Sequence, residues 1–129
     1  MTRKEARDIT FILIFEKLFS DSSPDEILQL ASEVRDIEPD DYVTDVFKGV
    51  CEKEEELTSI ISQKAIGWSI SRISKTSLAV LKLAIYEIKY MDSIPNSVSI
   101  NEAVELCKKY ATQDDASFVN GILASVVKG

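Results

Sequence analysis

Apolar residues recur at intervals of three and four along most of the chain, a spacing that places them on one face of successive helices. No run of residues shows the period-two alternation typical of a half-buried strand. The pattern predicts helices over about residues 3–19, from Pro24, over 41–65, from Leu78 to about Tyr90, over 99–110 and over 115–127, with a short helical connector at 68–74. We therefore expect an all-α, single-domain bundle of about seven helices over residues 1–129.

Two sequence motifs indicate where helices begin. Thr2 is followed by Glu5, and Ser99 by Glu102. This is the spacing of a capping box, in which the hydroxyl and the carboxylate each accept a hydrogen bond from a free N–H of the first turn. The apolar run Ile9–Phe15 alone is also compatible with a buried strand, but the capping box before it favours a helix.

Several large side chains are expected to lie in the core. Trp68 and Tyr86 are aromatic residues in or near apolar helical segments, and such residues usually pack inside. Tyr90 is near a helix end and is expected to be more exposed. In the second helix, helical spacing assigns four residues to the buried face: Ile27, Leu30, Ala31 and Val34.

The two cysteines, Cys51 and Cys107, both lie on apolar helix faces. Free cysteine behaves as a small apolar residue, so we expect both thiols to be buried and reduced rather than joined in a disulfide or a metal site. The sequence shows no N-terminal secretion signal and no stretch of about 20 apolar residues. These features predict a cytoplasmic protein that does not span a membrane.

The net charge of −7 is unevenly distributed. Residues 21–57 contain thirteen acidic and three basic residues, whereas the segments on either side are slightly basic. The overall charge disfavours long-range attraction of nucleic acid. Local contacts to phosphate remain possible within a screening length of about 8 Å. We expect the acidic segment to lie away from any nucleic-acid site.

The composition argues against catalysis. The chain has no histidine, which excludes the histidine-dependent nucleophile systems and histidine metal sites, and its four glycines form no phosphate-binding loop. The pairs Asp40–Asp41 and Asp114–Asp115 lie at expected helix starts, where aspartate caps free N–H groups. Glu54–Glu56 is interpreted as a solvated helix face. A binding protein without cofactor or metal is therefore predicted.

One stretch, Ile94–Gly121, combines a proline, the expected capping box and the sequence Phe118-Val119-Asn120-Gly121. This combination resembles the NusB family of transcription antitermination proteins. Further similarities are Ala6-Arg7-Asp8, Gly67-Trp68-Ser69 and Leu81–Glu87. They follow the order of the family and cover most of the chain.

The resemblance implies the NusB fold and a role in binding rather than catalysis. A NusB protein pairs with NusE, a small-subunit ribosomal protein, and the heterodimer binds boxA-like single-stranded RNA in nascent ribosomal transcripts. It thereby helps the RNA polymerase antitermination complex read through terminators. The residues that the resemblance and the local charge assign to RNA are Arg3, Lys4, Arg7, Lys108, Asp114, Phe118 and Asn120.

Each of these residues also has a structural interpretation. Arg3 and Arg7 share a helix face and could grip successive phosphates, or they could lie at a solvated helix end, with Arg7 paired to Asp8 or a more distant acid. Phe118 could be a core aromatic residue, and Asn120 could cap a neighbouring helix. Among the seven, we expect Arg7 to contribute most to RNA binding, because it lies one turn inside the helix.

The sequence departs from the family at three places. The family often has a lysine or arginine where Ser117 stands, and a glycine where Ala111 stands; alanine there would be strained in a left-handed conformation. It usually has charged residues where this chain has Thr76, Ser77 and Leu78. These departures concern affinity for RNA and for the protein partner rather than the fold.

Two other functions remain open at this point. One is a relative of the RNA-binding accessory domain of RNA cytosine methyltransferases, which shares this fold; the absence of a methyl-donor domain before Gly129 favours a free-standing factor. The other is a homodimer that hides its RNA face. Because the basic segments are small, the protein alone is expected to bind RNA weakly and to need NusE.

Overall fold

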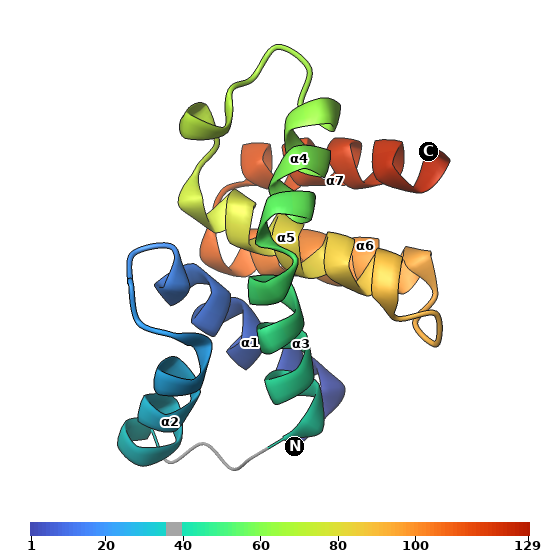
Figure 1. The fold of residues 1–129 in the computed structure, drawn as a ribbon. Coiled ribbons are helices and arrows are strands. Elements are labelled where there is room, and N and C mark those ends of the chain that lie inside the picture. Colours follow the sequence, from blue (N-terminus) through green and yellow to red (C-terminus); the bar gives the residue numbers. More distant parts are fainter. Residues whose placement is uncertain (36–39) are drawn as a thin grey trace.

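The structure is a computed structural model that describes residues 1–35 and 40–129. In these residues it contains helices and no strand, as predicted (Figure 1). The elements are α1 (Arg3–Lys17), α2 (Pro24–Arg35), α3 (Asp41–Glu52), α4 (Glu54–Lys64), the 3₁₀ helix η1 (Ile70–Arg72), α5 (Lys75–Tyr90), α6 (Asn96–Tyr110) and α7 (Gln113–Lys128).

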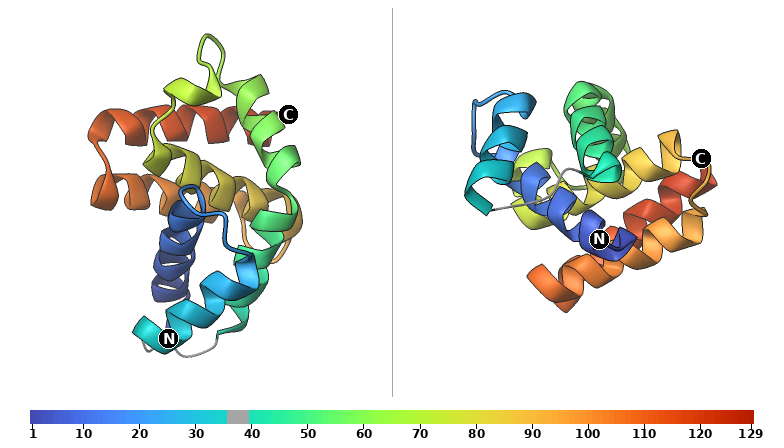
Figure 2. Two further views of the ribbon diagram at one scale, coloured as in Figure 1. Left: turned by 60° about the vertical axis from the view of Figure 1, so that its left-hand side comes forward. Right: turned by 90° about the horizontal axis from the view of Figure 1, so that it is seen from below.

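Helix α5 lies at the centre of the molecule. It packs against α1, α3, α4, α6 and α7, and every residue from Ser77 to Ile85 is buried. Figure 2 shows α6 and α7 side by side, with α1, α2 and α3 grouped at the other end of the molecule. The buried apolar side chains of these helices form one continuous cluster. Helix α5 has a wide apolar face, and it is therefore the common partner that positions α1 relative to α6.

One predicted capping box is confirmed and the other is wrong. The Thr2 hydroxyl accepts a hydrogen bond from the Glu5 backbone at 3.1 Å, and Glu5 accepts one from the Thr2 N–H at 3.0 Å. In contrast, α6 begins at Asn96, directly after Pro95, and Ser99 lies inside it. The Ser99 hydroxyl donates a hydrogen bond to the buried carboxylate of Glu87 on α5 instead. A tertiary contact thus overrides the local motif.

The predicted helix over 41–65 is two helices. The chain leaves helical geometry at Lys53, where φ is −98° and ψ is 20°, and α4 starts directly afterwards. Glu54–Glu56 form the first turn of α4, where carboxylates favourably oppose the positive end of the helix dipole. The interpretation of these acids as a plain solvated face is therefore incomplete. Glu54 also binds the buried ammonium of Lys82 at 2.7 Å.

The exposure of the large side chains partly follows prediction. Tyr90 is exposed, as expected, and Tyr86 is half-buried against the core. Trp68 is not a core residue: it is 50% exposed, because it lies in the connector between α4 and α5 rather than on a helix face. On α2, only Ile27 and Ala31 of the four predicted positions are buried. The other two remain exposed because α2 packs at the edge of the bundle, on α1 and α3.

Helices α3 and α5 approach each other closely at Gly49. A Cβ atom at this position would lie 2.1 Å from the hydroxyl oxygen of Tyr86, a distance that no pair of non-bonded heavy atoms tolerates. The absence of a side chain at Gly49 thus makes room for the Tyr86 ring between the two helices.

The cysteines form no disulfide. Cys107 is completely buried, as predicted, and burial raises the pKa of its thiol to about 11. Cys51 is only partly buried, so the prediction that this thiol is buried is wrong. It lies beside Lys17 and Lys82 in a hollow of about 270 Å³ between the end of α1 and helices α3 to α5.

Candidate nucleic-acid interface

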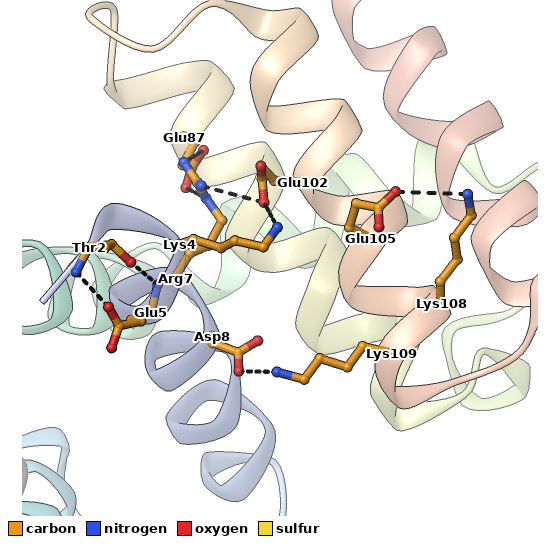
Figure 3. A network of polar contacts seen from close by, with 10 residues as sticks. All are labelled: Thr2, Lys4, Glu5, Arg7, Asp8, Glu87, Glu102, Glu105, Lys108 and Lys109. Carbon is orange, nitrogen blue, oxygen red and sulfur yellow. Dashed lines mark hydrogen bonds and ion pairs between the residues drawn. The ribbon is translucent and has the colours of Figure 1, made fainter.

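Side chains of the N-terminal half of α1 meet those of α6 across a groove of about 290 Å³. Figure 3 shows the charged side chains that converge there from the two helices. The groove is lined by Thr2, Lys4, Glu5, Arg7, Asp8, Glu102, Glu105, Leu106 and Lys109. Its charged lining consists of three cations and four carboxylates, so the groove is mixed in charge rather than basic.

Arg7 is at the bottom of this groove and is 95% buried, with only 5% of its surface exposed. Its Nε donates to Glu87 Oε2 at 2.8 Å, and its Nη2 donates to Glu87 Oε1 at 3.4 Å. Burial alone would lower the pKa of Arg7, but the hydrogen bonds and the charge of Glu87 outweigh it and raise the pKa. Arg7 is therefore a buried, charged partner of α5.

The Glu87 carboxylate on α5 accepts hydrogen bonds from side chains of three other helices. Besides Arg7 from α1, it accepts hydrogen bonds from the hydroxyl of Tyr42 on α3 and, at 2.7 Å, from that of Ser99 on α6. Burial and the nearby Glu87 charge raise the pKa of Tyr42, which stays protonated as a donor. In the described part of the chain, no buried side-chain nitrogen or oxygen lacks a partner. We call Arg7, Tyr42, Glu87 and Ser99 the Glu87 cluster.

The structure thus changes the picture of Arg7. We expected an exposed side chain, with a salt bridge to Asp8 or to a more distant acid as the structural alternative. The second form of that alternative is found, because the main partner of Arg7 is Glu87 on α5. Asp8 instead accepts hydrogen bonds from Lys109 at 2.7 Å and from the Tyr110 hydroxyl at 2.9 Å. The sequence did contain a signal for this cluster: Glu87 is the one carboxylate of the central, largely apolar helix α5. Such a residue needs a buried partner.

The other two N-terminal cations are more accessible. The Lys4 ammonium lies 3.3 Å from Glu102 on α6, and the Lys4 side chain is 71% exposed. Glu102 also lies 3.9 Å from Arg7 Nη1. The Arg3 guanidinium lies over the Tyr42 ring, 4.5 Å from its centroid, in a cation–π contact.

The remaining predicted residues lie elsewhere. Lys108 and Asn120 line a second, wider groove of about 490 Å³ between α6 and α7. The Lys108 ammonium is 3.8 Å from Glu105 on the same helix. Asn120 is exposed, and the described structure shows no cap made by its side chain.

Asp114 and Phe118 lie near the start of α7. Asp114 is exposed and takes no part in the cap of α7, which is a capping box formed by the N-cap residue Thr112 and by Asp115. Phe118 is half-buried and meets Trp68 edge to face, with ring centroids 5.5 Å apart. The structure therefore separates the seven predicted residues: two line the α1–α6 groove, two line the α6–α7 groove, two lie near the start of α7, and Arg3 lies over the Tyr42 ring.

Comparison with known proteins agrees with this architecture. A sequence model described as the NusB family matches residues 4–128. The chain belongs to the NusB family. It is 44% identical to the transcription antitermination protein NusB of Ruminiclostridium cellulolyticum over 131 aligned positions, covering 100% of this chain and 90% of that protein.

Solved NusB structures share the fold. One, described as antitermination factors NusB and NusE in complex with dsRNA, has a TM-score of 0.87 and 28% identity, covering 98% of this chain and 96% of that chain. NusB from T. maritima has a TM-score of 0.86 and 29% identity, covering 99% of this chain and 92% of that chain. The predicted NusB fold is thus confirmed.

Two of the departures from the NusB family sequence can be placed. Ala111, between α6 and α7, has φ −136° and ψ −141°, so its backbone is not left-handed and needs no glycine. Ser117 is exposed in the α6–α7 groove. A basic side chain in NusB relatives at this position would add charge to that groove.

Two further observations on the described residues concern membrane spans and metal sites. None of the helices there combines the length and apolar character that a membrane crossing demands. Within the same residues, histidine, cysteine, aspartate and glutamate side chains do not gather in groups of three that would suit a metal ion.

Proposed function

We propose that this protein acts in transcription antitermination by binding RNA together with a NusE-type ribosomal protein, without catalysing a reaction. The observation that carries the proposal is the match of nearly the whole fold to a NusB that was solved with NusE and RNA. The relatives that match along their length are transcription antitermination proteins. The proposed place of action is the cytoplasm, on nascent transcripts bound to RNA polymerase.

We assign RNA contact to side chains that are exposed. Arg3 and Lys4 at the start of α1, and Lys108 and Asn120 in the α6–α7 groove, can reach a phosphate or a base edge without disturbing the core. Phe118 offers a partly exposed ring for stacking, and Asp114 an acceptor for a base amino group. For Arg7 we propose a positioning role, because its Nε and Nη2 groups already donate hydrogen bonds to the Glu87 carboxylate.

The charge of the two grooves supports a need for the partner. Lys4, Arg7, Lys108 and Lys109 each lie within 4 Å of a carboxylate, and the whole chain has a net charge of −7. The electrostatic contribution of such paired cations to phosphate binding is small. NusE would therefore have to supply additional contacts.

The direct test is a titration of labelled boxA-like RNA with this protein alone, with NusE alone and with both. We expect weak binding by each protein and tight binding by the mixture, with read-through of a terminator by RNA polymerase as the functional readout. Equal affinity with and without NusE would contradict partner dependence. Competition by single-stranded and double-stranded forms of the same sequence would decide which form is bound.

Two alternatives lead to different outcomes in the same experiments. A methyltransferase accessory domain is not favoured, because the relatives that match over the full chain are transcription antitermination proteins. A homodimer with a hidden RNA face would show twice the monomer mass by light scattering, and it would be replaced by a complex with one copy of this chain when NusE and RNA are added.

A further inference from the structure

Glu102 lies between the two cations of the α1–α6 groove. It is 3.3 Å from the Lys4 ammonium and 3.9 Å from the Arg7 guanidinium, whereas Arg7 has a second carboxylate partner in Glu87. Figure 3 shows Lys4 and Glu102 meeting across the groove, from α1 and α6 respectively. Glu102 is thus the carboxylate partner of Lys4, one of the two exposed cations at the start of α1.

We propose that Glu102 sets the affinity for RNA by competing with the RNA phosphate for Lys4. This inference rests on the proposed function, since it assumes that RNA approaches the start of α1. A phosphate has to displace the Glu102 carboxylate before Lys4 can bind it. The displaced carboxylate stays on α6, near the incoming phosphate, and two like charges at close range repel.

The exposure of the two side chains supports this competition. Lys4 is 71% exposed, so its pair with Glu102 is weak and can be exchanged for a phosphate. The Glu102 side chain is only 22% exposed and is also attracted by Arg7, so it has little freedom to turn away. Repulsion of phosphate by Glu102 therefore persists after Lys4 has been released.

Asp8, a second carboxylate in the groove with a lysine partner on α6, has a different role. It accepts hydrogen bonds from both Lys109 and Tyr110, and the Tyr110 ring stacks on Phe11 at 5.0 Å between centroids. Asp8 therefore joins the C-terminal end of α6 to α1. Its replacement would disturb the packing of the groove, whereas replacement of Glu102 changes mainly charge.

The test compares RNA binding by the wild-type protein and by Glu102→Gln, each in the presence of NusE with labelled boxA-like RNA. We expect Glu102→Gln to tighten binding about two- to fivefold. The dependence of log affinity on log salt should become steeper by about 0.7, which corresponds to one additional phosphate contact on a single strand. Glu102→Ala makes the same change in charge and should act in the same direction.

Two control variants separate local competition from net charge. Glu55→Gln removes one negative charge at an exposed position on α4, a helix that packs against α5 and α7. It should leave affinity nearly unchanged. In a protein that also carries Lys4→Met, Glu102→Gln should lose most of its effect, because without the Lys4 ammonium neither competition for that cation nor repulsion of a phosphate bound to it remains.

The outcomes distinguish the inference from the proposed function. If Glu55→Gln tightens binding as much as Glu102→Gln, or if the gain persists with Lys4→Met, the effect is one of total charge and the role of Glu102 is refuted, while RNA binding stands. If no variant binds RNA even with NusE, the proposed function itself is refuted. An unchanged melting temperature of Glu102→Gln would show that the fold is not responsible.

Discussion

Arg7 and Glu87 are 80 residues apart in the chain, yet their side chains form a buried ion pair, with Nε and Oε2 2.8 Å apart. The pair is almost completely withdrawn from water: the exposed fractions of the two side chains are 6% and 1%. Two hydroxyl groups, of Tyr42 and Ser99, complete the carboxylate's hydrogen bonds. An arginine at a site that looked suited to RNA is thus part of the core.

We predict that Arg7→Ala destabilises the fold by about 3 to 5 kcal/mol, because it leaves the Glu87 carboxylate buried without its cation. Chemical denaturation of the purified protein measures this change. Lys4→Ala is the matched control: its cation pairs at an exposed site and should contribute less than about 1 kcal/mol. Equal stability of the two variants would show that the Glu87 carboxylate does not depend on Arg7.

We predict that Gly49→Ala destabilises the protein by about 1 to 3 kcal/mol, because the new methyl group has to displace the Tyr86 side chain. The unfolding free energy of the single variants and of Gly49→Ala with Tyr86→Ala tests the cause. In the double variant the methyl group no longer meets the ring. The double variant should therefore lose less unfolding free energy than the two single variants lose together. Strict additivity would point to a cause within α3 itself.

We predict that stability falls as the pH rises from about 9 to 11. The Cys107 thiol has a pKa of about 11 in the folded protein, above its value in the unfolded chain, so the folded state keeps its proton over this range. Its stabilising contribution is complete below the unfolded pKa and is lost as pH rises through the folded pKa.

A pH series of unfolding free energies for the wild type and Cys107→Ala isolates this contribution. The wild-type curve should fall more steeply, by about 2 kcal/mol over the range, since one pKa unit corresponds to about 1.4 kcal/mol. Parallel curves would assign the alkaline loss to other groups, such as Tyr42, whose pKa is also raised by burial.

We predict that a thiol reagent labels Cys51 much faster than Cys107 in the native protein. Cys51 is partly exposed beside a hollow, whereas Cys107 is completely buried and reacts only when the fold opens. Mass spectrometry of the labelled protein over time, with Cys51→Ser as control, measures the two rates. Labelling of both residues at one rate would mean that Cys51 is as protected as Cys107.

Much of the fold follows from local patterns in the sequence. Helical spacing predicts the all-α class and the central position of α5, and the resemblance in Ile94–Gly121 predicts the NusB fold. Two local interpretations, of Ser99 as a helix cap and of Glu54 as a solvated acid, are wrong or incomplete for the same reason. Ser99 and Glu54 each have a local interpretation, but their partners, Glu87 and Lys82, are distant in sequence.

The candidate site was less predictable than the fold. A sequence pattern shows that Arg7 is charged and near a helix start, but it cannot show which carboxylate lies opposite after folding. Similarly, Trp68 has the size of a core residue, and its place in the predicted connector did not show that the fold leaves it 50% exposed. Charge pairing and exposure depend on tertiary packing, and they decide which residues RNA can reach.

The Glu87 cluster also has a consequence for motion. Because one carboxylate binds donors from α1, α3 and α6, the first helix cannot detach without breaking hydrogen bonds in the interior of the bundle. Opening of α1 is thereby coupled to opening of the whole molecule, so the amide protons around Arg7 should exchange with solvent almost as slowly as those of α5. The end of the protein that presents Arg3 and Lys4 is held in place before any ligand arrives, which lowers the entropy lost on binding.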